Sequence, residues 1–209
     1  MIMRKETKEN NVKLVEFYPE VGEWAVRWDF SQKQGEEGTY WFEETTFNYI
    51  PTIEDIQQVI IRWLNQQTDS VIRAGFVWKG IEVFLNDENK FNFKAITDEA
   101  TRREEAIAIW DKENPELAGV YSTTQETVDG QGVTVQKVIP TGRPKSLLPA
   151  TLKLGRNNTA ESFYVFETLS ELQQFFSDGV DHLVSAYGVG WYRISTFDWL
   201  PYAKALEEL

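Results

Sequence analysis

The sequence predicts an α+β protein, in which an antiparallel sheet with an N-terminal β-meander packs against two to four helices. Three patterns support this class. Residues 23–30 alternate between large apolar and smaller or polar side chains, which indicates a strand. Residues 52–67 carry apolar side chains at spacings of three and four, which indicates a helix. Residues 71–85 place apolar runs on both sides of Lys79-Gly80, which indicates a β-hairpin.

These patterns divide the chain at about residue 50. We expect residues 1–50 to form a charged tail of about ten residues, followed by a small antiparallel meander. We expect residues 51–209 to form the core α+β domain, interrupted at about 101–146 by an inserted helix extension and hairpin. The strands of the meander are expected at 13–18, 23–30 and 39–47.

The strand at 23–30 has two different faces. Alternate residues of a strand point to opposite sides of the sheet. The residues expected on one face are Trp24, Val26, Trp28 and Phe30, and those on the other are Ala25, Arg27 and Asp29.

Capping residues locate the helix starts. Thr52 stands at the N-cap of the helix at 52–67, whose apolar stripe is Ile53, Ile56, Val59, Ile60, Trp63 and Leu64. Asn86 stands at the N-cap of a second helix, which runs from Asp87 to about Ala100 and is prolonged by residues 101–113.

A third helix begins at a capping box formed by Thr168 and Glu171. Gly188 and Gly190 are expected to end it at about residue 187, because glycine commonly follows the last helical turn. Residues 191–194 then form a short strand or turn. Asp198 caps a last helix that runs to Leu209.

Residues 116–145 differ in character from the core. Thr-rich strands at 120–128 and 133–139 flank Asp129-Gly130-Gln131-Gly132, a strong turn signal. A two-stranded hairpin is marginal in water unless something covers one of its faces, so we expect a protein partner here. The candidate contact residues are Tyr121, Val128, Asp129, Gly130, Val133 and Val135.

The composition of the chain limits which classes of partner and of functional site it can have. The formal charge of -12 opposes binding to nucleic acid or to anionic lipid, so neither is an expected partner. The chain has no cysteine, which excludes disulfides, thiolate nucleophiles and sulfur metal ligands. Its start has no apolar core of a signal peptide, and no later run approaches the roughly 18 apolar residues of a spanning helix. We expect a soluble, untargeted protein.

Catalytic patterns are weak. His182 is the only histidine and is expected to be a packing or surface residue of its helix. Glu43 and Glu44 lie beside aromatic residues, but neighbours in a strand point to opposite faces, so the two carboxylates cannot flank one glycosidic bond. A hydrolase that uses another carboxylate pair remains an alternative. We expect no cofactor, no metal and no enzymatic activity.

Aromatic residues make up 14% of the chain. They are expected mainly to fill the core, with an interface or a sugar-binding face as the alternative. The residues expected to be mostly buried are Trp63, Phe76, Phe91, Leu172, Phe176 and Leu183.

Five segments of the chain carry a further signal: 75–80, 85–95, 148–155, 166–172 and the C-terminal part through Gly190-Trp191 to Asp198-Trp199 and Leu206. Together they resemble a family of phage and prophage proteins of unassigned biochemical function, encoded among tail and tail-fibre genes and frequent in phages of gut Bacteroidetes. The resemblance covers about 52–100 and 147–209, and residues of about 101–146 replace the short link usual in the family.

The resemblance implies a bacteriophage structural or tail-associated protein, either a virion component or an adaptor, that acts through protein–protein contacts and is not an enzyme. Its partners would be other phage structural proteins or further copies of the chain, and its location the virion, assembled in the host cytoplasm. The alternatives are a tail-fibre assembly chaperone that leaves the particle, and a carbohydrate-binding module for the host surface, with a glycan the less favoured partner. No catalytic residue is implied.

Overall fold

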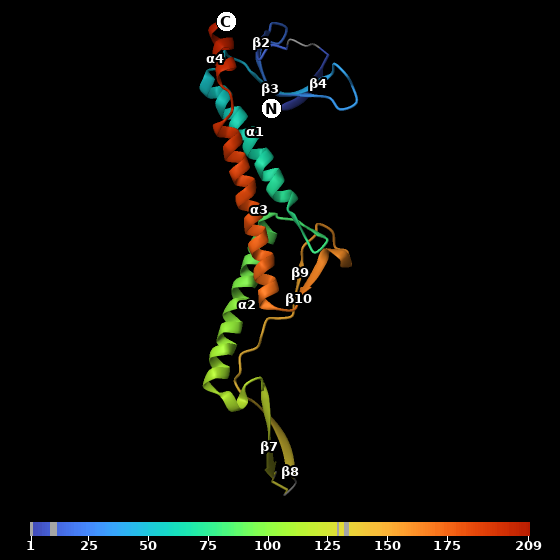
Figure 1. Cartoon of the computed structure of the whole chain (residues 1–209), viewed down its shortest axis with the longest axis vertical. Coiled ribbons are helices and arrows are strands. Elements are labelled where there is room, and N and C mark those ends of the chain that lie inside the picture. Colours follow the sequence, from blue (N-terminus) through green and yellow to red (C-terminus); the bar gives the residue numbers. More distant parts are fainter. Residues whose placement is uncertain (1, 9–11, 129, 132–133) are drawn as a thin grey trace. The chain divides into compact units, whose positions relative to one another are not determined.

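The computed structural model describes residues 2–8, 12–128, 130–131 and 134–209 (Figure 1). It confirms the α+β class, since the described strands form antiparallel sheets that are joined by long helices. The chain forms two compact units: Met1–Asp69 with Tyr187–Leu209, and Ser70–Ala186. This division differs from the expected boundary at about residue 50. Two long helices, α1 (Ile53–Ala74) and α3 (Leu169–Ser195), contribute residues to both units.

The first unit contains the meander, a four-stranded antiparallel sheet in the order β1-β4-β3-β2. The strands are β1 (Met3–Thr7), β2 (Val15–Tyr18), β3 (Glu23–Gln32) and β4 (Tyr40–Phe47). The expectation of an unstructured tail is wrong for β1, which pairs along β4. Cross-strand contacts stabilise this pairing, because Lys5 forms an ion pair with Glu44 and the Arg4 guanidinium lies 5.4 Å from the Trp41 ring centroid.

Phe30 does not share the face of Trp28, contrary to the expectation. Asp29 adopts a φ of 56°, and the β3–β4 register shifts between Trp28 and Ser31. This bulge turns Phe30 toward Phe42, with ring centroids 5.6 Å apart. Val26 and Trp28 stay on the expected side, where they join a buried cluster.

Helix α1 packs its predicted stripe against this sheet. Thr52 caps it as expected, since its Oγ1 accepts a hydrogen bond from the Asp55 amide at 3.2 Å. The helix runs beyond residue 67 to Ala74, because no helix-breaking residue precedes Gly75. The buried members of the cluster are Val15, Val26, Trp28, Ile56, Ile60, Trp63, Leu64 and, from α4 (Leu200–Glu207), Tyr202.

The second unit begins with a hairpin of β5 (Phe76–Trp78) and β6 (Ile81–Val83), shorter than the expected 71–85 because residues 71–74 belong to α1. Gly75 is required where α1 ends: its φ is 77°, and a Cβ there would lie 1.6 Å from the Val83 carbonyl oxygen.

Helix α2 (Asp87–Glu113) follows this hairpin. Asn86 caps it as expected, with its Oδ1 accepting from the Asn89 amide at 2.8 Å. Strands β9 (Ala150–Lys153) and β10 (Phe163–Phe166) form a separate antiparallel pair. The described strands therefore make four separate sheets rather than one.

Helix α3 begins at the predicted capping box, since the Glu171 amide donates to Thr168 Oγ1 at 3.2 Å. It does not end at Gly188 and Gly190 but continues to Ser195, so residues 191–194 are helical. Gly190 is accommodated because its missing side chain makes room for Thr68: a Cβ at 190 would lie 2.3 Å from Thr68 Oγ1. Asp198 Oδ1 accepts from the Leu200 amide at 3.1 Å, near the start of α4.

The core of the second unit confirms part of the expected burial. Leu172 is buried, as is Trp63 in the first unit. Phe76, Phe176 and Leu183 are only half-buried. Phe91 is 71% exposed, so its predicted burial is wrong: on α2 it is Phe93 that points to the core. The buried residues of this cluster are Trp78, Val83, Leu85, Phe93, Ala100, Leu152, Leu154, Phe166, Leu172 and Phe175.

Candidate protein-contact site

The candidate contact residues belong to a hairpin formed by β7 (Ser122–Val128) and β8 (Thr134–Pro140). Of the six, Tyr121 precedes β7 and is 43% exposed, while Val128 and Val135 are 69% and 45% exposed. Gly130 is exposed in the turn between the strands. Asp129 and Val133 lie outside the described residues.

Val128 and Val135 do not share a face of the hairpin. Val128 pairs with Thr134, and the next pair along the ladder is Thr127 with Val135, so the two valines point to opposite sides. The side of Val128 instead carries Val138, which pairs with Thr124 and is 65% exposed. Sequence reasoning missed Val138, although counting the pairs outward from the turn would have found it.

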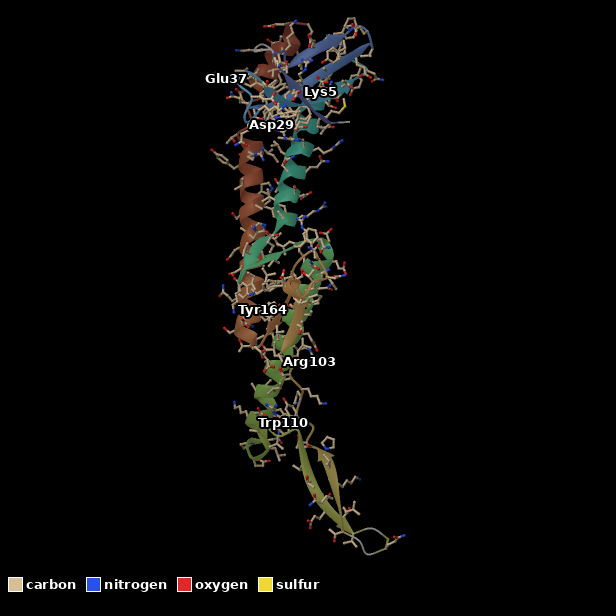
Figure 2. All side chains as sticks on the ribbon, turned by 90° about the vertical axis from the view of Figure 1, so that its right-hand side faces the viewer. Lys5, Asp29, Glu37, Arg103, Trp110 and Tyr164 are labelled. Atoms are coloured by element: carbon tan, nitrogen blue, oxygen red, sulfur yellow. The ribbon has the colours of Figure 1, made fainter. Side chains whose placement is uncertain are left out.

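Both faces of the hairpin are open to solvent. Every described residue of the two strands is exposed, apart from Ile139, which is half-buried. In the described part of the chain, neither Figure 1 nor Figure 2 shows another element alongside the two strands. Among the described residues, β7 and β8 form a two-stranded sheet with no third strand, so the backbone groups of their outer edges have no strand partner there.

The base of the hairpin, in contrast, is fastened to the end of α2. The Arg143 Nε and Nη2 atoms donate to the two carboxylate oxygens of Asp111, each at 2.7 Å. The same guanidinium lies 4.7 Å from the Tyr121 ring centroid. The Arg143 bonds lower the pKa of Asp111, and the Asp111 bonds raise the pKa of Arg143.

Tyr121 therefore has a partner within the chain, and its position is at the anchored base. A second tie joins the strand ends, because the Thr141 amide and hydroxyl donate to the carbonyl oxygens of Tyr121 and Val120 at 3.1 and 2.7 Å. Asp111 and Arg143 carried no sequence signal, since 32 positions separate them.

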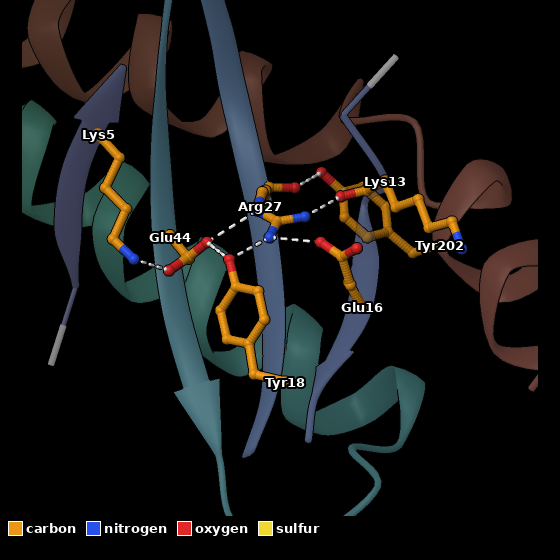
Figure 3. Close-up of polar contacts among 7 residues, drawn as sticks. All are labelled: Lys5, Lys13, Glu16, Tyr18, Arg27, Glu44 and Tyr202. Atoms are coloured by element: carbon orange, nitrogen blue, oxygen red, sulfur yellow. Dashed lines mark hydrogen bonds and ion pairs between the residues drawn. The ribbon is translucent and has the colours of Figure 1, made fainter. Parts of the chain in front are cut away.

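A second polar group, shown in Figure 3, lies on the meander of the first unit. Glu44 on β4 is fully buried, and Arg27 on β3 is 3% exposed. The Arg27 Nε atom donates to Glu44 Oε2 at 2.7 Å, and its Nη2 atom donates to Glu16 Oε2 at 2.8 Å. Lys5 also donates to Glu44, and the Tyr18 hydroxyl lies between the two buried groups, 3.1 Å from Glu44 Oε2.

Every charge in this group is matched. Burial opposes ionisation of Glu44, but the bonds from Lys5 and Arg27 outweigh it, so the pKa of Glu44 is lowered. Burial likewise opposes the charge of Arg27, but its bonds to Glu16, Glu44 and Tyr18 leave its pKa raised. The remaining Arg27 Nη1 donates to the Lys13 carbonyl at 2.7 Å. With its hydrogen bonds used inside the sheet, the group acts as a structural ion network.

Glu43 belongs to the other face of β4, as expected from its position next to Glu44. It pairs with Trp28 on β3 and with Arg4 on β1. Burial raises the pKa of Glu43, an effect that the charge of Arg4 partly offsets and that of Asp29 reinforces. The two neighbouring carboxylates therefore do not converge on one substrate position.

His182 packs within the second unit, in line with the expectation. Its Nε2 atom lies 3.3 Å from the Val71 carbonyl oxygen, and its ring centroid is 6.1 Å from that of Phe76. An apolar cavity of about 220 Å³ lies nearby, lined by Phe76, Leu85, Phe93, Phe175, Phe176 and Leu183, together with Lys90 and Lys94. Each of the two lysines forms an ion pair, Lys90 with Asp87 and Lys94 with Asp98.

Among the described residues, no group of three or more His, Cys, Asp or Glu side chains could hold a metal ion. Within the same residues, each helix is too short or too polar to cross a membrane.

Comparison of the chain with protein-family models, with curated proteins and with solved structures found no match.

Proposed function

We propose that this chain is a structural or tail-associated protein of a bacteriophage, a virion component or adaptor that acts through protein–protein contacts and not as an enzyme. The observation that carries the contact role is the β7–β8 hairpin, which exposes both faces while Asp111 and Arg143 hold its base. The assignment to a phage tail rests on the family resemblance alone.

The physics of the hairpin favours a partner. An isolated two-stranded hairpin is marginal in water, because its strands bury little surface. None of its cross-strand pairs joins two apolar side chains, and two of them, Gln125 with Lys137 and Glu126 with Gln136, are polar on both sides. Val128 and Val138 stand out on one face as exposed apolar groups. A partner that covers this face or pairs with an outer edge would supply the missing burial.

The segments that carry the resemblance supply seven of the buried core residues of the second unit: Trp78, Leu85, Phe93, Leu152, Leu154, Phe166 and Leu172. A fold tolerates loop insertions at little cost, and such insertions are where partner contacts are commonly added, so the segment at about 101–146 is the proposed contact element. The proposed partners are other phage structural proteins or further copies of the chain, and the proposed location is the virion, assembled in the host cytoplasm.

The test compares two substitutions of matched exposure. Val138→Arg alters the hairpin at a residue that is 65% exposed, and Val77→Arg alters β5 at one that is 66% exposed. We expect both variants to keep the thermal midpoint of the isolated protein, because neither side chain is buried. Only Val138→Arg should reduce the amount of the protein that mass spectrometry detects in purified particles of the encoding phage.

Three outcomes would count against this proposal. Equal incorporation of both variants would remove the hairpin from the contact. Absence of the unaltered protein from purified particles would favour the assembly chaperone. Binding on a glycan array would favour the carbohydrate module.

A further inference from the structure

The apolar cavity near His182 lies wholly within the second unit and has a volume of about 220 Å³. Part of its wall belongs to the core, since Leu85, Phe93 and Phe175 are buried. The other apolar side chains of the wall are half-buried or exposed: Phe76, Phe176, Val180 and Leu183. The wall therefore reaches from the core to the surface. An engineered apolar cavity of about 150 Å³ binds benzene, so this one has room for a ring or a short alkyl chain.

Gly179 on α3 keeps part of this volume free. Glycine in the middle of a helix is destabilising relative to alanine. A Cβ at Gly179 would lie 3.5 Å from Phe76 Cε1, an ordinary van der Waals distance, whereas a Cβ at Gly190 would collide with Thr68. The packing of the chain therefore does not require glycine at 179. The side chain that is absent there leaves space in the cavity for a ligand.

The charged residues of the wall, Lys90 and Lys94, are both cations. They lie one turn apart on α2, on the same side of the helix as Phe93. Their aliphatic stems extend the apolar wall, while the side chains as a whole are 31% and 63% exposed and keep their ammonium groups in water. The chain has 33 acidic and 21 basic residues, yet no Asp or Glu is among the described residues that line the cavity. The cavity therefore favours a ligand whose apolar body ends in a negative charge.

Each lysine has a carboxylate partner with which such a ligand competes. Lys90 pairs with Asp87 at 2.8 Å, and Lys94 pairs with Asp98. The side chains of these two aspartates are 91% and 61% exposed, so the ion pairs contribute little to stability. Neither aspartate lines the cavity. A bound anion can therefore reach the ammonium groups without displacing a residue of the wall.

We propose that this cavity binds a free organic acid, in which a carboxylate is joined to a short alkyl chain or a ring. The apolar part fills the space beside Gly179, where the wall lacks dispersion contacts. The carboxylate lies by the ammonium groups of Lys90 and Lys94, which fix its orientation. A lipid in an anionic bilayer offers the same chemistry, but the net charge of -12 opposes approach to such a surface. The inference is independent of the contact role proposed for the hairpin.

The first test compares three molecules that share one alkyl chain and differ in the charge of the head group: octanoate, 1-octanol and octylammonium. Isothermal titration calorimetry of the full chain at pH 7 and low salt measures each Kd. We expect octanoate to bind at least about tenfold more tightly than octylammonium, with 1-octanol between them, because the lysines attract only the anion. Equal binding of octanoate and 1-octanol would overturn the preference for an anion.

The second test removes the two charges. Lys90→Gln combined with Lys94→Gln should raise the Kd of octanoate about fivefold, to near that of 1-octanol, and should change the Kd of 1-octanol less than about twofold. The matched control is Lys112→Gln, at an exposed lysine of the same helix that does not line the cavity. It should change neither Kd. Equal effects of the double variant and the control on octanoate would overturn the role of the two lysines.

The third test locates the ligand. Gly179→Leu places a side chain in the cavity, and Gly188→Leu places the same side chain at an exposed glycine of the same helix, where a Cβ would meet nothing within 4 Å. We expect the first to raise the Kd of octanoate at least about tenfold and the second to change it less than about twofold. Circular dichroism checks that both variants fold. If Gly179→Leu does not, Val180→Trp fills the cavity from a residue that is 39% exposed.

Three outcomes would overturn the inference as a whole. One is the absence of saturable octanoate binding up to about 10 mM, which would leave the cavity to an apolar side chain of a partner protein. Another is equal octanoate binding by the Gly179→Leu and Gly188→Leu variants, which would place the ligand elsewhere. The third is cosedimentation with vesicles of phosphatidylcholine and phosphatidylglycerol that the double lysine variant loses, which would assign the anion to a membrane lipid. Val138→Arg should leave the Kd of octanoate unchanged, so failure of this inference and failure of the proposed function are distinguishable.

Discussion

Glu43 and Glu44 are sequence neighbours with opposite electrostatics. Both are mostly removed from water, at 9% and 0% exposure. Burial raises the pKa of Glu43. Glu44 meets the same cost, but Lys5 and Arg27 donate to it and its pKa is lowered. The difference arises because a one-residue step along a strand changes the face of the sheet, and with it every partner of the side chain.

This contrast predicts opposite effects of the same substitution. A lowered folded-state pKa means that Glu44 stabilises the fold above its unfolded-state pKa, and this contribution is lost as the pH falls through the folded-state value. Glu44→Gln should therefore lower the free energy of unfolding at pH 7 by about 3 kcal/mol, since it removes one member of a buried ion network. The pH dependence of urea unfolding should also become flatter below pH 5.

The same substitution at Glu43 should have the opposite effect on stability. Its raised folded-state pKa makes the ionised form a burden on the fold at neutral pH, and this burden is relieved as the pH falls through the folded-state value. Glu43→Gln should therefore raise the urea midpoint at pH 7 and leave it nearly unchanged at acidic pH. Destabilisation by both substitutions at pH 7 would show that Glu43 has a favourable partner in the folded state.

Phe175 and Phe176 form a second pair of neighbours with different surroundings. Phe175 is 1% exposed, and its ring centroid lies 5.0 Å from that of Phe93 and 5.1 Å from that of Phe166. Phe175→Ala should cost about 3–5 kcal/mol, as the loss of a fully buried ring does. Phe176→Ala should cost clearly less, because Phe176 is half-buried. Equal shifts of the urea midpoint would contradict the helix register.

At the scale of elements, the length of α3 depends on one contact in the first unit. Gly190 lies against Thr68 of α1, whose hydroxyl donates to the Leu64 carbonyl at 3.0 Å. Gly190→Ala should cost about 1–3 kcal/mol, since the new methyl group overfills a packed contact. Combining it with Thr68→Ala should recover most of that loss. A double-mutant cycle measured by thermal unfolding would detect this coupling, and additive effects would place the two residues apart.

The helix starts were predictable because capping is local. Thr52, Asn86 and Thr168 each accept a hydrogen bond from an amide three residues ahead, so a short stretch of sequence carries the whole signal. The helix ends were less predictable. Local propensity alone ends α3 at Gly188, whereas its continuation depends on the contact of Gly190 with Thr68, far away in the sequence.

Contacts between residues far apart in the sequence explain most of the other differences between the predicted and the observed structure. The pairing of β1 involves Lys5 and Glu44, which are 39 positions apart. The face of Phe30 depends on the backbone at Asp29, where a non-glycine residue adopts a positive φ. The hairpin at β7–β8 was predicted from its turn and its Thr-rich strands, but the ion pair of Asp111 and Arg143 at its base was not. Local patterns thus located most elements, and tertiary contacts decided their faces and ends.

At the scale of the whole molecule, the main property is the excess of acidic over basic residues, 33 against 21. Such an excess keeps copies apart at low ionic strength, because their fields extend over about 30 Å at 0.01 M salt and about 8 Å at 0.15 M. Any contact between copies must therefore either pair opposite charges or use surface without charge. The two possibilities respond to salt in opposite directions.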